Sequence, residues 1–90
     1  MSEPLLLSAK LDLSAALGLV NDLKEIDGDI QVNASEVSHM GSLCVQALLA
    51  AARQAIANGH TMQITGISEK VSAQLDVMGL SPKTLMEGAQ

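Results

Sequence analysis

Three short stretches of the chain alternate apolar and polar residues, which predicts β-strands. Residues 5–13 (LLLSAKLDL) begin apolar and then alternate, and residues 29–33 (DIQVN) and 61–65 (TMQIT) alternate throughout. Successive side chains of a strand point to opposite faces, so this pattern gives each strand one apolar face and one polar face. We therefore expect strands whose apolar faces meet in a common core.

Helical spacing of apolar residues separates and follows these strands. Residues 15–26 and 42–57 repeat apolar side chains every three or four positions, and about ten residues after Ser68 do so over a shorter length. Ser14 and Ser68 are suited to cap the first and last of these helices, and Gly79 stops the last one. The expected inner faces comprise Ala16, Leu19, Val20, Leu23 and Ile26 in the first helix, Val45, Leu48, Leu49, Ala52 and Ile56 in the second, and Val71, Leu75 and Met78 in the third.

The order of strands and helices predicts an α/β fold. Strands that alternate with helices pair in parallel through right-handed crossovers, so we expect a small sheet of three or four mostly parallel strands with helices packed mainly on one face. We expect residues 1–90 to be a single domain, with its core over residues 5–80 and a partly flexible tail over residues 81–90 that adds one short turn. So thin a core leaves room for a protein partner or a homodimer at an exposed sheet face or edge.

The composition restricts both the core and the partners. Apolar residues make up 48% of the chain, but Phe, Trp and Tyr are absent, so the core consists of aliphatic side chains, Met and Ala. The chain therefore lacks the aromatic platforms on which nucleic-acid bases stack. Ten acidic and five basic residues give a formal net charge of −5 without a Lys/Arg cluster, so we do not expect a nucleic-acid partner.

The chain shows no sequence feature of membrane insertion or export. Its apolar runs are too short to cross a lipid bilayer. Residues 1–4 (MSEP) lack the basic and apolar regions of a signal peptide. We therefore expect a cytoplasmic protein that does not insert directly into a membrane.

The residues that carry catalytic and metal chemistry are few and poorly spaced. His39 and His60 lie in predicted turns without a second ligand at helical spacing, and Cys44 is the single cysteine, so we expect no metal site and no cofactor. The apolar neighbours of Cys44 favour a buried thiol over a reactive one. Ser42 and His39 lie on one turn with no carboxylate to orient the histidine, so we predict that the protein is not an enzyme.

Ser42 lies where the central helix begins, and its hydroxyl supports two interpretations. It is placed to cap the helix by accepting a hydrogen bond from a backbone N–H of the first turn, which is worth about 1 kcal/mol. The same position suits a phosphate, because free N–H groups and the positive end of the helix dipole favour an anion. Asp12 ends the first predicted strand, and in a parallel sheet that end lies beside the start of the central helix.

Residues 5–85 resemble the STAS domain, a family named for sulphate transporters and anti-sigma factor antagonists. Residues 9–12 (AKLD) are similar to the first landmark of the family, a strand end that reads Gly-Glu-Leu-Asp or a close variant. Residues 37–45 (VSHMGSLCV) are similar to the second landmark, a turn of the form Val-x-x-Ile/Met-Asp-Ser/Thr that opens a helix. A helix, glycine, strand, glycine and closing helix then follow in the order of the family over residues 51–80.

The resemblance implies a regulatory role for Ser42. In bacterial members, an anti-sigma factor kinase phosphorylates the Ser or Thr at this position, and a PP2C-type phosphatase removes the phosphate. The dephosphorylated form binds its protein partner. Phosphorylation adds about two negative charges at the interface with this partner and breaks the complex. This chain departs from the family pattern at Gly41, where the family has Asp, and at Leu43 and Cys44, where it has a small residue and Gly. The carboxylate beside the phosphate acceptor is therefore missing.

By this resemblance, the chain is a non-enzymatic regulatory module like an anti-sigma factor antagonist, switched through Ser42. The implied partner is a serine-kinase anti-sigma factor or a chemotaxis-type histidine kinase, each with a GHKL-type ATP-binding domain. The alternative is an accessory subunit of the ATPase in a phospholipid-transport ABC complex, whose family members have Thr at the position of Ser42. A nucleotide ligand is a weaker third idea, because aromatic residues are absent and basic residues are lacking near the turn.

We expect the partner to contact the turn before the central helix and the exposed side of that helix. Met40, Leu43 and Val45 offer an apolar patch that Asp12 and Glu36 surround, which suits a partly basic protein surface. The candidate contact residues are Asp12, His39, Met40, Gly41, Leu43, Val45 and Gln46, with Ser42 as the candidate phosphorylation site.

Overall fold

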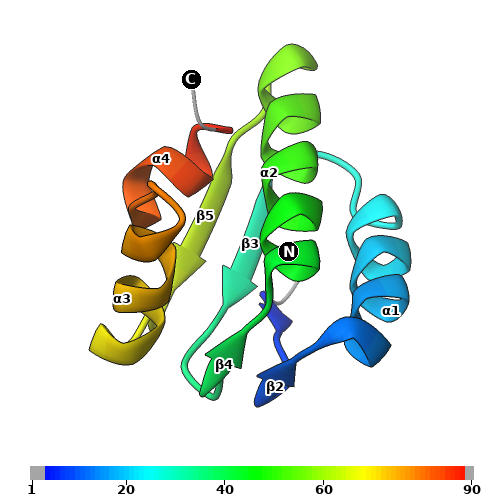
Figure 1. The fold of residues 1–90 in the computed structure, drawn as a ribbon. Coiled ribbons are helices and arrows are strands. Elements are labelled where there is room, and N and C mark those ends of the chain that lie inside the picture. Colours follow the sequence, from blue (N-terminus) through cyan, green and yellow to red (C-terminus); the bar gives the residue numbers. More distant parts are fainter. Residues whose placement is uncertain (1–3, 89–90) are drawn as a thin grey trace.

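A computed structural model describes residues 4–88 of the chain (Figure 1). In chain order the elements are β1 (Leu5–Leu6), β2 (Lys10–Leu11), α1 (Leu13–Lys24), β3 (Ile30–Asn33), β4 (His39–Met40), α2 (Ser42–Ala57), β5 (Met62–Thr65), α3 (Glu69–Val77) and α4 (Pro82–Met86). Every strand pair is parallel. The predicted α/β class with parallel strands is therefore confirmed.

The strands form two separate ladders. One sheet has the order β1-β3-β5, with Val32 of the central strand opposite Leu5 on one side and Ile64 on the other. The other sheet pairs β2 with β4, with Lys10 opposite His39. Parallel neighbours need crossover connections, and α1 and α2 supply them.

The first predicted strand, residues 5–13, is divided between these two sheets. Leu7 N–H still donates to Asn33 of β3 (3.0 Å), but the carbonyl of Ala9 accepts from Ser38 N–H (2.7 Å). The chain therefore changes its pairing partner between these residues. This change explains β4, which lies inside the stretch predicted as a turn: it becomes a strand because the second half of the first stretch is free to pair with it.

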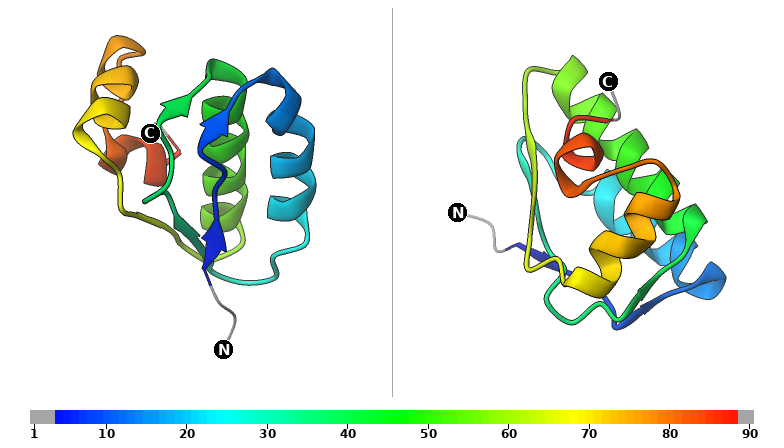
Figure 2. Two further views of the ribbon diagram at one scale, coloured as in Figure 1. Left: turned by 90° about the horizontal axis from the view of Figure 1, so that it is seen from below. Right: turned by 60° about the vertical axis from the view of Figure 1, so that its left-hand side comes forward.

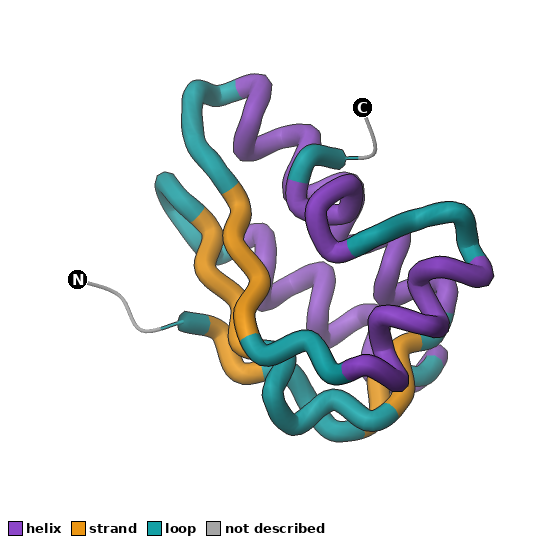
Figure 3. The backbone as a smooth tube through the Cα atoms, turned by 90° about the vertical axis from the view of Figure 1, so that its left-hand side faces the viewer, coloured by secondary structure: helices purple, strands orange, loops and turns teal. Residues whose placement is uncertain are grey.

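The helices lie on one face of the three-stranded sheet, as predicted (Figure 3). On that face the buried residues form one cluster of aliphatic side chains, Met and Cys. On the other face Gln31 and Gln63, which are opposite each other on β3 and β5, are exposed. The alternation of the sequence therefore sets which face of the sheet meets the helices.

Helix α2 is the centre of the packing and lies between α1 and α4 (Figure 1). Of its predicted inner face, Val45, Leu48 and Ala52 are buried. Ile56 is 44% exposed, and Ala55 is buried in its place. The buried stripe advances by three or four residues at each step, and the step from 52 leads to 55 rather than 56.

Helix α3 begins and ends where the sequence indicates. The Ser68 hydroxyl accepts a hydrogen bond from Val71 N–H (3.2 Å). Gly79 follows the helix with a φ of 77°, which a residue with a Cβ rarely adopts. Val71 and Leu75 are buried as predicted, whereas Met78 is partly exposed at the end of the helix.

Residues 81–88, the described part of the predicted tail, form a capped helix that contacts the core. Ser81 and Thr84 make a reciprocal capping box at the start of α4. Leu85 is fully buried, and Arg53 of α2 donates to the carbonyl of Gly88 (2.9 Å). Residues 89–90, the end of that tail, lie outside the described residues.

We predict that Leu85→Ala lowers the free energy of unfolding by about 2–5 kcal/mol, because it leaves a cavity under α4. Urea unfolding followed by circular dichroism measures this change. Lys83→Ala is the matched control on the exposed side of the same helix, and we expect it to change stability by less than about 0.5 kcal/mol. Equal stabilities of the two variants would contradict the docking of α4 on the core.

Candidate functional site

Helices α1 and α2 begin at the same end of the molecule, side by side (Figure 1). Each follows almost directly after one strand of the two-stranded sheet, α1 after β2 and α2 after β4. Because these strands pair in parallel, the two helix starts are held next to each other (Figure 2, left). The candidate site predicted from the sequence lies at this junction.

Gly41 joins β4 to α2 at a point of very close backbone approach. Its N–H donates to the carbonyl of Leu11 (2.7 Å), which extends the β2–β4 ladder by one bond. A Cβ on Gly41 would lie 2.9 Å from that same carbonyl oxygen and 3.8 Å from Cα of Asp12. The φ of −75° is open to any residue, so space rather than backbone conformation favours glycine here. The Asp of the family pattern therefore does not fit at this position without a backbone shift.

Ser42 is the first residue of α2, and its side chain is exposed. The N-cap is Gly41, and no side chain caps the start of this helix. The interpretation of Ser42 as the helix cap is therefore wrong, because the hydroxyl lies one position too late in the chain to accept that bond. The described residues contain no hydrogen-bond partner for this hydroxyl, which leaves it at the positive end of the helix dipole.

Asp12 is the N-cap of α1, a role that the sequence assigned to Ser14. Its Oδ1 accepts hydrogen bonds from Ala15 N–H (3.2 Å) and from the Ser14 hydroxyl (2.7 Å). The bond from Ser14, followed by smaller backbone contributions, lowers the pKa of Asp12 from its usual 3.8 despite partial desolvation. The carboxylate is therefore ionised at neutral pH, and it lies close to the start of α2.

Gln74 of α3 fixes the orientation of His39. The amide Oε1 of Gln74 accepts from Met40 N–H (2.9 Å), which satisfies a backbone donor at the open edge of β4. Its amide nitrogen then lies 3.2 Å from Nδ1 of His39. Because the Gln74 amide nitrogen only donates, Nδ1 of His39 accepts, and in the neutral ring the proton lies on Nε2. His39 is thus a held, exposed side chain beside Gly41.

The predicted contact residues divide into an exposed and a buried group. His39, Leu43 and Gln46 are exposed with Asp12 and Ser42. Two others belong to the core: the side chains are 1% exposed at Met40 and 2% at Val45. The expected apolar patch around the helix start was therefore wrong in these two residues, because β4 and the inner face of α2 turn them toward the sheet.

Two exposed leucines that the sequence analysis missed lie on the neighbouring helix. Leu13 is 73% exposed and Leu17 is 78% exposed, and their spacing of four residues places them on one face of α1. Leu17 does not belong to the predicted inner stripe of this helix, which was a signal available in the sequence. We define the helix-start surface as the exposed residues Asp12, Leu13, Leu17, His39, Ser42, Leu43 and Gln46.

Cys44 lies directly beneath this surface. It is fully buried, and its thiol donates to the carbonyl of Asp12 (3.6 Å). Desolvation, with a smaller contribution from the Asp12 charge, raises the pKa of the thiol above its usual 9.0. The predicted buried thiol is confirmed, and it stays protonated at neutral pH.

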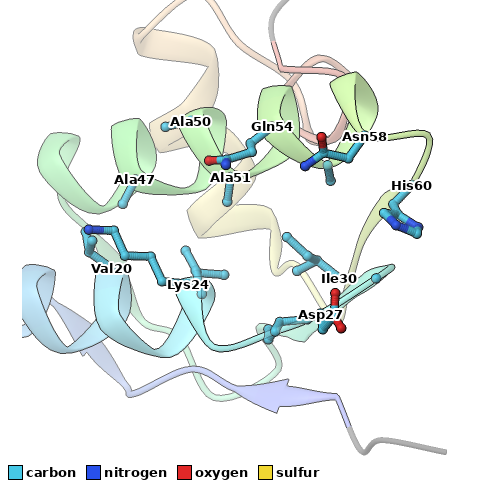
Figure 4. Close-up of a pocket in the computed structure, with 14 residues that line it drawn as sticks. Val20, Lys24, Asp27, Ile30, Ala47, Ala50, Ala51, Gln54, Asn58 and His60 are labelled. Carbon is cyan, nitrogen blue, oxygen red and sulfur yellow. The ribbon is translucent and has the colours of Figure 1, made fainter.

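A pocket lies between α1 and α2, away from the helix starts (Figure 4). It has a volume of about 390 Å³, and small side chains such as Ala47 and Ala51 form its α2 side opposite Lys24. His60 and Asp27 line it as well, and His60 Nδ1 lies 3.5 Å from Asp29. Within residues 4–88 no group of three His, Cys, Asp or Glu side chains is arranged to hold a metal ion.

The parallel strands and four helices define a class of small α/β domains. A sequence model of the family described as "Mlab, STAS domain" matches residues 3–87. The chain therefore belongs to the STAS family, whose members are generally not enzymes. No curated protein matches the chain significantly.

Across residues 4–88, no helix combines the length and the apolar character needed to cross a bilayer.

We predict that Gly41→Ala destabilises the protein by about 1–3 kcal/mol, because the added Cβ overlaps the Leu11 carbonyl and has only backbone to displace. Gly18→Ala is the matched control: it lies inside α1 with open space around its Cβ, and we expect it to stabilise the helix by up to about 1 kcal/mol. Thermal or urea unfolding distinguishes the two. A neutral Gly41→Ala would contradict the close approach of the two backbones.

Proposed function

We propose that this protein is a non-enzymatic binding module that docks on another protein through the helix-start surface. The observation that carries the proposal is the exposure of Leu13 and Leu17 on α1 and of Leu43 at the start of α2, next to a Ser42 hydroxyl that makes no hydrogen bond within residues 4–88. Large apolar side chains that stay exposed at one end of a domain are typical of a protein interface. His39 and Asp12 add polar groups at its rim, both held by hydrogen bonds.

The partner that we propose is the ATPase of a phospholipid-transport ABC complex. Two observations support it over a kinase partner. The matched family carries the description "Mlab, STAS domain". The acidic residue that precedes the phosphate acceptor in the wider STAS pattern is Gly41 here, packed where a side chain does not fit. A surface built without that carboxylate suits permanent binding more than a phosphorylation switch.

The second candidate function is an anti-sigma factor antagonist that is switched by phosphorylation of Ser42. The free, exposed hydroxyl favours it, because a kinase needs an accessible acceptor. A phosphate at this position gains from the helix dipole, so the domain stays folded. It also adds about two negative charges close to Asp12, which opposes an apolar or acidic partner.

Leu17→Glu tests the docking surface. We expect it to weaken binding of the copurified ATPase at least about tenfold, because it places a charge where an apolar contact is expected. Val77→Glu is the matched control, since Val77 is an exposed residue (89%) on α3, outside the helix-start surface. Both variants keep the fold by circular dichroism, because both side chains point to solvent. Equal affinity of Leu17→Glu and wild type, measured by titration, would place the interface elsewhere.

Ser42→Asp separates the two candidate functions. A carboxylate at the first position of a helix is compatible with folding, so any loss of binding reflects the interface. We expect an ABC ATPase to copurify with wild type and, at lower recovery because the added charge lies in the docking surface, with Ser42→Asp. We expect the intact mass of the native protein to show no phosphate. Gln31→Glu adds the same charge on the open sheet face and controls for net charge. A GHKL-type kinase that copurifies with wild type only, together with a phosphorylated fraction, would instead support the switch.

A further inference from the structure

Strand β5 is an edge strand whose outer side is open. The bonds from Ile30 N–H to Thr61 and from Ala34 N–H to Thr65 show which residues of this segment face β3. In a parallel ladder the alternate residues face away, so the backbone groups of Met62 and Ile64 point outward. Ile64 N–H donates only to the Met86 thioether (3.2 Å), a weak acceptor, and the other three outward groups bond to nothing within residues 4–88.

The sequence of this edge lacks the residues that normally prevent strands from pairing between molecules, although α4 contacts the edge through Met86. Residues 61–65 contain no charge, no proline and no glycine, whereas protected edge strands carry lysine, proline or a bulge. An open groove of about 520 Å³ follows the edge, and it is lined by β5, by the exposed Ile56 and by α4. Its charged residues are Lys83 and Glu87, one of each sign.

We propose that a second copy of this chain pairs with the outer edge of β5, strand to strand and antiparallel, about a two-fold axis at Gln63. In this register Met62 lies opposite Ile64 of the other copy, and these two residues exchange two N–H···O=C bonds. By symmetry, Ile64 of the first copy and Met62 of the other copy exchange two more. These bonds use all the outward backbone groups of both residues. The two three-stranded sheets become one six-stranded sheet.

The occupant is a second copy because the edge is complementary to itself. The outward groups are spaced symmetrically about Gln63, so one rotation satisfies donors and acceptors in both copies. Gln63 then faces its own counterpart on the open side of the sheet, where two amide groups are able to hydrogen-bond to each other. Met62 and Ile64 keep their side chains in the core, and the flexible Met86, whose thioether accepts from Ile64 N–H, has to move.

This dimer leaves the helix-start surface free. Strand β5 and α1 lie on opposite sides of α2 and β3, so a partner on α1 does not meet the second copy (Figure 1). The inference is therefore independent of the proposed function. A contact made by one short strand and its groove belongs to the small, weak class of interfaces, so we expect a dimer that depends on protein concentration.

Gln63→Cys tests the register directly. In the proposed register, Gln63 and its counterpart form a non-hydrogen-bonded pair of an antiparallel ladder, in which the two Cα atoms are about 4.5 Å apart. A disulfide joins residues whose Cα atoms are about 4.4–6.8 Å apart. Under mild oxidation we expect a disulfide-linked dimer on a non-reducing gel. Gln31→Cys is the matched control, exposed on the same face but on the central strand. Cys44 is buried and stays reduced. Equal cross-linking of the two variants would overturn the proposed register.

Substitutions that place a charge at position 63 test the dimer in solution. In sedimentation equilibrium we expect Gln63→Lys and Gln63→Glu each to weaken self-association by about two- to fivefold, because like charges oppose each other. An equimolar mixture of the two variants should associate more tightly than either one alone. Gln31→Lys should match wild type. A wild-type protein that stays monomeric up to millimolar concentration overturns the proposal. The proposal is also overturned if the amides of β5 are protected from hydrogen exchange only when a different protein is bound.

Discussion

The structure depends on the close approach of two backbones where Gly41 meets Leu11. The Gly41 N–H bonds to the Leu11 carbonyl (2.7 Å) at the end of the β2–β4 ladder, and the absence of a Cβ on Gly41 allows this close approach. Since each strand leads into a helix, this contact fixes the starts of α1 and α2 side by side. A side chain at position 41, such as the Asp of the wider family pattern, would require a backbone shift, because its Cβ would lie 2.9 Å from the Leu11 carbonyl oxygen. The exposed residues of both helix starts then form one surface rather than two.

Two surfaces of the molecule differ in chemistry, and we propose a different partner for each. The helix-start surface combines exposed leucines with a fixed carboxylate and a fixed imidazole, and suits a folded protein with its own apolar patch. The edge of β5 offers backbone groups and uncharged side chains, and suits another strand. Both surfaces follow from a small aliphatic core. Helices cover one face of the sheet, and within residues 4–88 no helix covers its other face (Figure 3).

The periodicity of the sequence was enough to predict the fold class, α3 and the buried faces of β3 and β5. It was not enough to divide residues 5–13 between two sheets, because alternation shows that a residue is extended but not which strand it pairs with. The cap of α1 was assigned to Ser14 instead of Asp12, and a cap was one of the two interpretations of Ser42. A shift of one or two residues at a helix start leaves the apolar spacing unchanged, so periodicity does not locate the cap. The exposure of Leu17 agrees with its place outside the predicted inner stripe, but the sequence analysis did not use that signal to assign Leu17 to the binding surface.

The central claim is that the helix-start surface is where this STAS domain meets its partner. Hydrogen–deuterium exchange of the chain, free and in its copurified complex, tests this claim most directly. We expect binding to slow exchange in the first turns of α1 and α2 and in the turn that contains Gly41, while the open face of β3, at Gln31, exchanges as in the free protein. Slowed exchange at Gln31 with unchanged helix starts would contradict the account.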